Sequence, residues 1–273
     1  MKNMKENIKT KSLGIFDSGI GGLTVVSQII KKLPNENIVY FGDTARVPYG
    51  SKSEKVIIDY SLQIANFLVS KDIKMLVVAC NTVSSVALDI LSARFNVPVV
   101  GVIKPGAKAA ASATKIKKVG VIGTRTTIRS DVYSKEIKSI DKDIFVISKP
   151  CPLFVPLVEE GWIDHPVTRM VAMEYLSSFI ESGIDSLVLG CTHYPIIRNI
   201  IQETVGKNIK LIDSAESTAQ EVANILKQNQ IMNTSSRTPN YQYFVSDLPH
   251  QFDEIGTRFL GRKLKNVKRI QLG

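Results

Sequence analysis

Residues 13–33 read LGIFDSGIGGLTVVSQIIKKL, an apolar run followed by a glycine-rich turn and an amphipathic run. Leu13–Phe16 has the continuous apolarity of a strand buried on both faces of a parallel sheet. Leu23–Leu33 has apolar residues at helical spacing. Together they predict a strand–turn–helix unit, the building block of an α/β fold.

The same alternation continues along the rest of the chain. Further strands are predicted at 38–41, 75–79, 97–102, 119–122, 144–147, 187–189, 211–212 and 241–245. Further helices are predicted at 54–71, 85–95, 130–139, 167–182, 196–205 and 218–227, with a last helix and strand after residue 245. The sequence therefore predicts an α/β fold built on parallel sheets.

Two parts of the chain resemble each other. Gly14–Ser18 leads into a helix, and a later apolar strand ends at Cys80. Gly120–Thr124 also leads into a helix, and a later strand ends at Cys191. We expect two similar parallel-sheet lobes related by pseudo-symmetry, with the active site in the cleft between them. Chance similarity between two parallel-sheet lobes is the alternative.

The expected first lobe comprises residues 1–101 with 213–273, and the expected second lobe comprises residues 102–212. A separate third unit at the C-terminal end is the alternative. About 60 residues make only a marginal core of their own, so we favour a return of the chain to the first lobe.

Composition limits the class of protein. The chain has 273 residues, is 44% hydrophobic and contains three cysteines, none in a Cys-x-x-Cys pair. No apolar run reaches the roughly 18–20 residues of a membrane helix, and the start lacks the apolar stretch of a signal peptide. We therefore expect a cytoplasmic protein with no membrane partner, no disulfide framework and no zinc knuckle.

The net charge of +10 raises the question of a nucleic-acid partner. Residues 1–11 carry +3 and residues 257–273 carry +6, so the body of the chain is nearly neutral. The basic ends contain no recognition motif and no interleaved aromatic residues. We expect solvated ends and no nucleic-acid partner.

Cys80 and Cys191 each follow a predicted buried strand and precede a helix. Ligands bind at this end of the strands in open α/β sheets. Backbone N–H groups and the helix dipole there are expected to lower the pKa of each thiol. A free cysteine often only fills buried space, but two at equivalent turns favour a functional role. Cys151 has no equivalent, and we expect it to fill space.

Asp17 begins a glycine-rich turn, residues 17–22, that fits neither the G-x-G-x-x-G nor the Walker pattern. Two interpretations of Asp17 stay open: a side chain that orients or deprotonates a neighbour in the cleft, or a cap of the helix that follows. Residues 40–50 are polar and rich in turn residues, which indicates a substrate loop.

His193 lies two residues after Cys191 and is a candidate general acid or base. No spacing typical of metal ligands surrounds it, so no metal is expected. Glu159 is a carboxylate among apolar residues, and it could equally be a solvated charge at a helix end.

Together these motifs resemble the glutamate racemases, within the cofactor-independent aspartate/glutamate racemase family. The matching stretches are residues 14–24, 41–50, 79–82, 152–159 and 189–195. The resemblance implies an isomerase that interconverts L- and D-glutamate without a cofactor, the D form feeding bacterial peptidoglycan. It also implies two α/β lobes facing each other across the substrate. A homodimer is compatible with it.

The resemblance also implies residue roles. Cys80 and Cys191 exchange the α-proton on opposite faces of the substrate, Asp17 assists Cys80, His193 assists Cys191, and Glu159 tunes His193. The residues expected to hold the small-molecule substrate, glutamate, are Asp17, Ser18, Tyr49, Gly50, Asn81, Thr82, Thr192 and His193.

The chemistry agrees with this assignment. Inversion of a stereocentre without a cofactor needs a base on one face of the carbon and an acid on the other. Two lobes that each carry one cysteine supply that pair. Hydroxyl and amide donors would stabilise the substrate carboxylate as charge develops on it. No lysine Schiff-base motif is evident, so pyridoxal phosphate is not required.

Three alternatives remain. The same scaffold could racemise aspartate or a hydantoin or decarboxylate malonate, although a decarboxylase needs only one cysteine. Two lobes around a cleft could form a small-molecule binding protein. A Cys–His hydrolase built on Cys191 and His193 is disfavoured, because adjacent turn residues seldom face each other and Cys80 would have no role.

Overall fold

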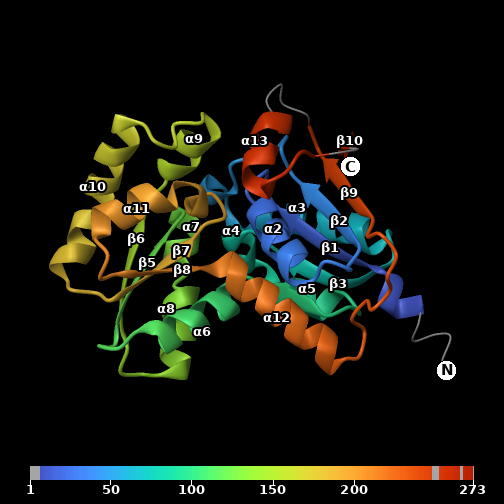
Figure 1. Cartoon of the computed structure of the whole chain (residues 1–273), viewed down its shortest axis with the longest axis horizontal. Coiled ribbons are helices and arrows are strands. Elements are labelled where there is room, and N and C mark those ends of the chain that lie inside the picture. The colour runs from blue at the N-terminus through green and yellow to red at the C-terminus, as the bar shows by residue number, and fades with distance from the viewer. Residues whose placement is uncertain (1–6, 248–251, 265–266, 273) are drawn as a thin grey trace.

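Two β-sheets form the centre of the structure, a computed structural model that describes residues 7–247, 252–264 and 267–272 (Figure 1). Every strand pairing is parallel. The strands of the first sheet are β1 (Ser12–Asp17), β2 (Ile38–Gly42), β3 (Ile73–Val78), β4 (Val99–Gly101), β9 (Tyr241–Val245) and β10 (Val267–Arg269). Those of the second are β5 (Lys118–Gly123), β6 (Phe145–Pro150), β7 (Ser186–Gly190) and β8 (Lys210–Asp213). The predicted α/β fold with two parallel-sheet lobes is confirmed.

The four strands of the second sheet have the same order as four strands of the first. The first sheet runs β10-β9-β2-β1-β3-β4 and the second runs β6-β5-β7-β8, so β2-β1-β3-β4 corresponds to β6-β5-β7-β8. In both sheets the second strand of this set in the chain lies on one side of the first strand, and the third and fourth lie on the other side. Such a reversal opens a crevice at the carboxyl ends of the two central strands, where ligands are held in α/β proteins. The pairs β1/β3 and β5/β7 mark that place in each lobe.

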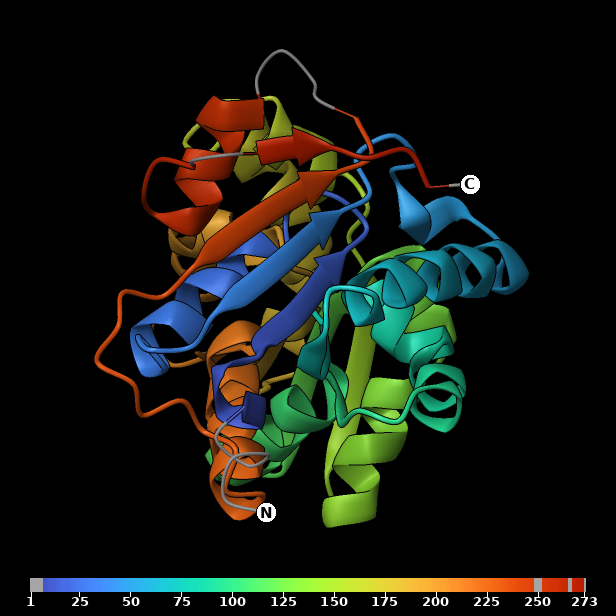
Figure 2. The same ribbon diagram turned by 90° about the vertical axis from the view of Figure 1, so that its right-hand side faces the viewer.

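The C-terminal part of the chain extends the first sheet. β9 pairs with β2, and β10 pairs with β9 (Figure 2). The connecting helix α12 (Ser214–Gln228) packs against α2 (Leu23–Lys32) and α6 (Ile103–Ala113), and in Figure 1 it runs from the boundary between the lobes along the lower side of the first lobe. The residue limits of the two lobes stay a prediction.

The remaining helices cover the sheets. They are α3 (Glu54–Val69), α4 (Asn81–Val86), α5 (Leu88–Arg94), α7 (Arg125–Arg129), α8 (Val132–Ile140), α9 (Phe154–Glu159), α10 (Pro166–Glu181), α11 (Arg198–Val205) and α13 (Phe252–Leu260). Two short 3₁₀ helices are η1 (Tyr49–Ser51) and η2 (Tyr194–Ile197).

Strand β1 shows why the apolar runs are continuous. Leu13 and Ile15 point into a core that reaches into the second lobe, whereas Phe16 points into a second core under α3. Because both faces are covered, alternation with polar residues would leave polar groups in one core.

Helix α6 was not predicted from the sequence. Pro105 and Gly106 resemble a chain break between lobes, but Pro105 lies in the first turn of the helix, where its missing N–H costs no hydrogen bond. The helix predicted at 85–95 is instead two short helices, α4 and α5, which meet at Ala87.

Candidate active site

All but one of the predicted site residues line a single small cavity, of about 40 Å³, at the carboxyl ends of the two sheets. Its wall consists of Ser18, Val47, Pro48, Tyr49, Gly50, Cys80, Asn81, Thr82, Thr124, Val155, Glu159, Cys191, Thr192 and His193. A cavity of this size excludes a peptide or a dinucleotide. The exception, Asp17, is fully buried and directly precedes Ser18 of this wall.

Cys80 follows β3 and precedes α4, and it is buried. Its Sγ atom lies 3.4 Å from Ser18 Oγ, at the end of the neighbouring strand β1. Burial, and to a smaller extent the nearby Asp17 carboxylate, raise the pKa of the Cys80 thiol to about 12. The expected lowering of this pKa is therefore wrong, because desolvation outweighs the N-terminal end of a six-residue helix.

Asp17 ends β1 and stabilises the glycine-rich turn. Its Oδ2 atom accepts a hydrogen bond from the Gly19 N–H at 3.0 Å. Helix α2 begins after Gly22, a residue that has no side chain with which to cap it. Burial raises the pKa of Asp17, opposed by the charge of His193.

Cys191 follows β7 in the second lobe and belongs to a row of three side chains. His193 Nδ1 lies 3.9 Å from Cys191 Sγ, and His193 Nε2 lies 2.9 Å from Glu159 Oε1. Contrary to the sequence-based expectation, the cysteine and the histidine of this turn do face each other. Cys80, in the same cavity, has no place in a Cys–His hydrolase.

The charge state of His193 follows from this row. Burial lowers its pKa, but hydrogen bonds and charges of Cys191 and Glu159 more than offset burial and raise the pKa to about 10. Glu159 ends α9 and its side chain is 35% exposed, yet its carboxylate is paired. It is therefore more than a solvated helix-end charge.

A loop that begins at Asp43 forms one side of the cavity. Residues 40–42 belong to β2 and are buried, so the predicted substrate loop is shorter at its start. The Asp43 carboxylate accepts hydrogen bonds from Arg46 Nε, the Tyr49 hydroxyl and Ser246 Oγ. The Tyr49 hydroxyl is thus committed to Asp43, and Tyr49 and Gly50 can offer their backbone to a ligand.

Hydrogen bonds join the two lobes around the cavity. Thr24 Oγ1 donates to the Thr192 carbonyl at 3.2 Å, and Thr126 Oγ1 donates to the Gly50 carbonyl at 3.0 Å. The hydroxyls of Thr82 and Thr124 lie 2.9 Å apart. These contacts close the cavity and limit the access of water.

The glycine-rich turn takes part in this contact. A Cβ atom on Gly21 would lie 2.2 Å from Thr192 Oγ1 and 2.6 Å from the ring of His193. Only glycine lets the first lobe approach the turn formed by residues 191–193 of the second this closely.

Two buried atoms of the site have no hydrogen-bond partner among the residues that the structure describes. They are Asp17 Oδ1, an acceptor, and Asn81 Nδ2, a donor. Buried polar groups without partners cost stability, so a ligand that satisfies both is favoured. A small zwitterion, with an ammonium and a carboxylate group, has the matching chemistry.

Val47 and Pro48 of the wall belong to the predicted substrate loop, whereas Thr124 and Val155 were not predicted as cavity residues. Thr124 could have been found, because it occupies in Gly120–Thr124 the place that Ser18 occupies in Gly14–Ser18. Val155 lies on helix α9, and only the tertiary structure brings it to the cavity.

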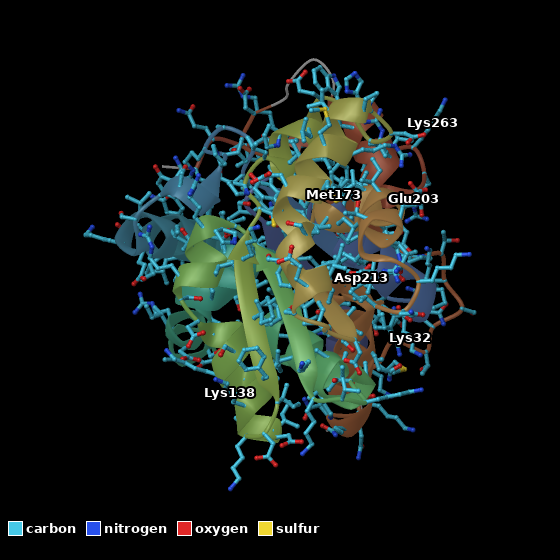
Figure 3. All side chains as sticks on the ribbon, turned by 90° about the vertical axis from the view of Figure 1, so that its left-hand side faces the viewer. Lys32, Lys138, Met173, Glu203, Asp213 and Lys263 are labelled. Carbon is cyan, nitrogen blue, oxygen red and sulfur yellow. The ribbon has the colours of Figure 1, made fainter. Side chains whose placement is uncertain are left out.

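A second, larger groove of about 570 Å³ lies away from the cysteines, between α2, α6, β8 and α12. Lys32 and Asp213, labelled in Figure 3, belong to its wall. Its lining contains no cysteine or histidine and offers no acid–base pair comparable to that of the small cavity.

Over the described ranges, no group of three or more His, Cys, Asp or Glu side chains is placed to hold a metal ion. In the same part of the chain, no helix is long and apolar enough to cross a membrane. All three cysteines are free thiols.

Comparison with known proteins extends these observations. The sequence pattern of the Asp/Glu/Hydantoin racemase family matches residues 21–222. A glutamate racemase of Geobacter metallireducens is 55% identical over 96% of this chain and 97% of its own length. A glutamate racemase of Neisseria meningitidis serogroup A is 48% identical over 98% of this chain and 100% of its own length.

Solved structures of glutamate racemases are also similar to this chain. The crystal structure of a glutamate racemase from Francisella tularensis in complex with D-glutamate superposes with a TM-score of 0.92 at 39% identity. The match covers 97% of this chain and 98% of that one. The racemase of Aquifex pyrophilus superposes with a TM-score of 0.80 at 41% identity, over 94% and 98% of the two chains.

Proposed function

The chain belongs to the Asp/Glu/Hydantoin racemase family, and on that premise we propose that it is an isomerase that interconverts L- and D-glutamate. Relatives at 47–55% identity over nearly their whole length are glutamate racemases, and a structural neighbour holds D-glutamate. The D-glutamate formed would supply peptidoglycan synthesis.

One observation carries the proposed chemistry: Cys80 and Cys191 follow equivalent central strands of two sheets and line the same cavity. A thiolate on one side takes the α-proton, so that an S–H bond forms as the Cα–H bond breaks. The thiol on the other side gives its proton to the opposite face of the carbon. The configuration is inverted, and no cofactor is needed.

The two thiols have different neighbours. With its pKa at about 12, Cys80 is protonated at neutral pH and serves as the acid. Cys191 lies 3.9 Å from His193 Nδ1, and the pKa of His193 is raised to about 10, so a cationic partner lies beside Cys191 when it acts as the base. In this direction Cys191 removes the proton and Cys80 delivers one.

The reverse reaction requires a Cys80 thiolate. The substrate ammonium group, bound near Asp17, adds a positive charge close to Cys80 and opposes the effect of the Asp17 carboxylate on its pKa. Substrate binding thus places beside Cys80 a positive charge that the free enzyme does not have there, and this charge favours the Cys80 thiolate. Asp17 and His193 assist Cys80 and Cys191 respectively, and Glu159 tunes His193.

Recognition of the amino acid uses the two unsatisfied atoms. Asp17 Oδ1 accepts from the ammonium group, and Asn81 Nδ2 donates to the carboxylate. Ser18, Thr82 and Thr192 supply hydroxyl groups around them. Removal of the α-proton increases the negative charge on the carboxylate, so donors fixed there stabilise the transition state more than the ground state.

Racemisation in deuterium oxide tests this mechanism. We expect the wild-type protein to incorporate solvent deuterium at the α-carbon of either enantiomer of glutamate. Cys80→Ala and Cys191→Ala should each lower turnover at least 100-fold, the order of one general acid–base contribution. If both variants kept wild-type turnover and full deuterium uptake, the two-thiol mechanism would be wrong.

Cys151→Ala is the matched control, because Cys151 is a buried free thiol that is absent from the cavity wall. It should keep near-wild-type activity. Parallel assays with L- and D-aspartate test the choice of substrate, and faster turnover of aspartate than of glutamate would overturn the proposed function.

Two further parts of the proposal concern the setting of the enzyme. A cytoplasmic location is supported by the three free cysteines, which suit a reducing compartment. A homodimer is proposed on the resemblance to the family, and light scattering of the purified protein tests it.

A further inference from the structure

We propose that Tyr133 is a positioning residue for the racemisation. From the second lobe it holds the side-chain amide of Asn81, in the first lobe, so that the NH₂ group of Asn81 is turned toward the substrate carboxylate. This inference rests on the proposed function and assigns a task to a residue outside the cavity wall.

The contact joins the lobes directly beside a catalytic thiol. Asn81 is the first residue of α4, next to Cys80, and lines the cavity. Tyr133 belongs to α8, and its hydroxyl lies 2.7 Å from Asn81 Oδ1. Both residues are 2% exposed, so water does not compete for this hydrogen bond.

The direction of this hydrogen bond decides which end of the Asn81 amide faces the cavity. A tyrosine hydroxyl can donate or accept, and an amide can present either its oxygen or its nitrogen. Here the Tyr133 hydroxyl donates to the oxygen end, Asn81 Oδ1. Ser214, the first residue of α12, lies close to the same hydroxyl, since a Cβ atom on Gly106 would lie 3.2 Å from the hydroxyl oxygen and 3.3 Å from Ser214 Cβ.

Burial strengthens this assignment. It raises the pKa of Tyr133, so the phenol keeps its proton across the physiological range. A neutral phenol that donates selects the oxygen end of the amide. The nitrogen end is thereby left over, and Asn81 Nδ2 is the atom without a partner among the described residues.

The ring of Tyr133 is fixed by its packing. A Cβ atom on Gly106 would lie 3.2 Å from the hydroxyl oxygen, and one on Gly190 would lie 3.2 Å from a ring carbon. The two glycines make room for a full tyrosine between α6 and β7. A phenylalanine fits the same space, so Tyr133→Phe removes only the hydroxyl.

The decisive measurement is a double-mutant cycle on kcat/KM for glutamate. Tyr133→Phe should lower kcat/KM about 3- to 10-fold, the effect of one buried hydrogen bond. In an Asn81→Ala background the same change should have no further effect, because there is no amide left to orient. Calorimetric titration with D-glutamate gives the same comparison where turnover is too slow to measure.

Tyr175→Phe is the matched control. Its hydroxyl oxygen accepts a hydrogen bond from the Leu153 N–H, within the second lobe and away from Asn81. It should leave kcat/KM unchanged in both backgrounds. Thermal unfolding should show Tyr133→Phe to be folded.

The outcomes distinguish a failure of the proposed function from a failure of the role assigned to Tyr133. A wild-type protein that does not racemise glutamate overturns the proposed function. Suppose instead that the wild-type protein is active, and that Tyr133→Phe either keeps wild-type kcat/KM or lowers kcat/KM by the same factor in the Asn81→Ala background as in the wild type. In either case Tyr133 does not act through Asn81 and the inference is wrong.

Discussion

His193 lies between Glu159 and Cys191, and both neighbours favour its protonated form. Its raised pKa, about 10, depends on Glu159 on one side and on Cys191 on the other. A group with a raised pKa is charged below that value and loses its charge as the pH rises through it. The assistance that His193 gives to Cys191 should therefore be present at neutral pH and disappear in alkaline solution.

Replacement of Glu159 tests this dependence. Glu159→Gln removes the carboxylate, so the pKa of His193 should fall and the alkaline loss of kcat should move to lower pH. At pH 8 we expect kcat to drop about 10- to 100-fold, as for the loss of a charged hydrogen-bond partner of an active group. The measurement is the pH profile of kcat in both directions.

Glu160→Gln controls for the change of net charge, because Glu160 is the exposed neighbour of Glu159. It should have the wild-type profile. An unchanged profile in Glu159→Gln as well would show that the pair does not set the charge of His193.

At the scale of elements, one loop is held in place by a single carboxylate. Asp43 joins Arg46 and Tyr49 to Ser246, which follows β9. Asp43→Asn removes the charge that these donors share. We expect KM for glutamate to rise about 10-fold while kcat changes less, because the loop shapes the cavity and carries no acid–base group.

Steady-state kinetics of Asp43→Asn beside Asp59→Asn measure this effect. Asp59 is an exposed residue of α3 that pairs with Lys55, and its change should leave KM unaltered. A lower melting temperature with an unchanged KM would make Asp43 a purely structural residue.

The strands and turns of the fold could largely be predicted from the sequence, whereas one helix could not. Buried strands were predictable, since apolar runs such as Ile38–Phe41 reflect cover on both faces. The cysteine turns were predictable too, because their motif residues are local in sequence. Helix α6 was not, since Pro105 and Gly106 are typical of a break unless the position of Pro105 in the first turn is known.

Residues that act across the cleft were beyond prediction. Tyr133 belongs to an ordinary helix, and nothing near it in sequence indicates Asn81 as its partner. The prediction of a lowered pKa for Cys80 was wrong for the same reason. The helix N-terminus is a local feature, but the burial that outweighs it comes from the packing of the two lobes.

At the scale of the whole molecule, a buried ion pair fastens the returning chain. Lys74 Nζ lies 2.5 Å from Glu36 Oε2, and the two side chains are 0% and 1% exposed. Lys74 also donates to the Ile231 carbonyl, and Glu36 Oε1 accepts from the Asn233 N–H. The pair thus ties the segment after α12 to the first sheet.

Glu36→Gln leaves Lys74 buried without its counter-charge. We expect the free energy of unfolding to fall by about 3–5 kcal/mol, measured by urea denaturation. Asp59→Asn, which breaks the exposed pair with Lys55, should leave the stability unchanged. A loss for Glu36→Gln no larger than for Asp59→Asn would mean that the buried pair is not needed to hold the segment.

The pairing of β9 with β2 has a consequence for biosynthesis. β2 is buried along its whole length, yet its outer neighbour is encoded after the entire second lobe. While a ribosome is still making that lobe, β2 is an open sheet edge of apolar side chains, the kind of surface that pairs with other chains. The first sheet to begin is therefore the last to be completed, and a nascent chain needs protection at β2 until residues 241–245 have emerged.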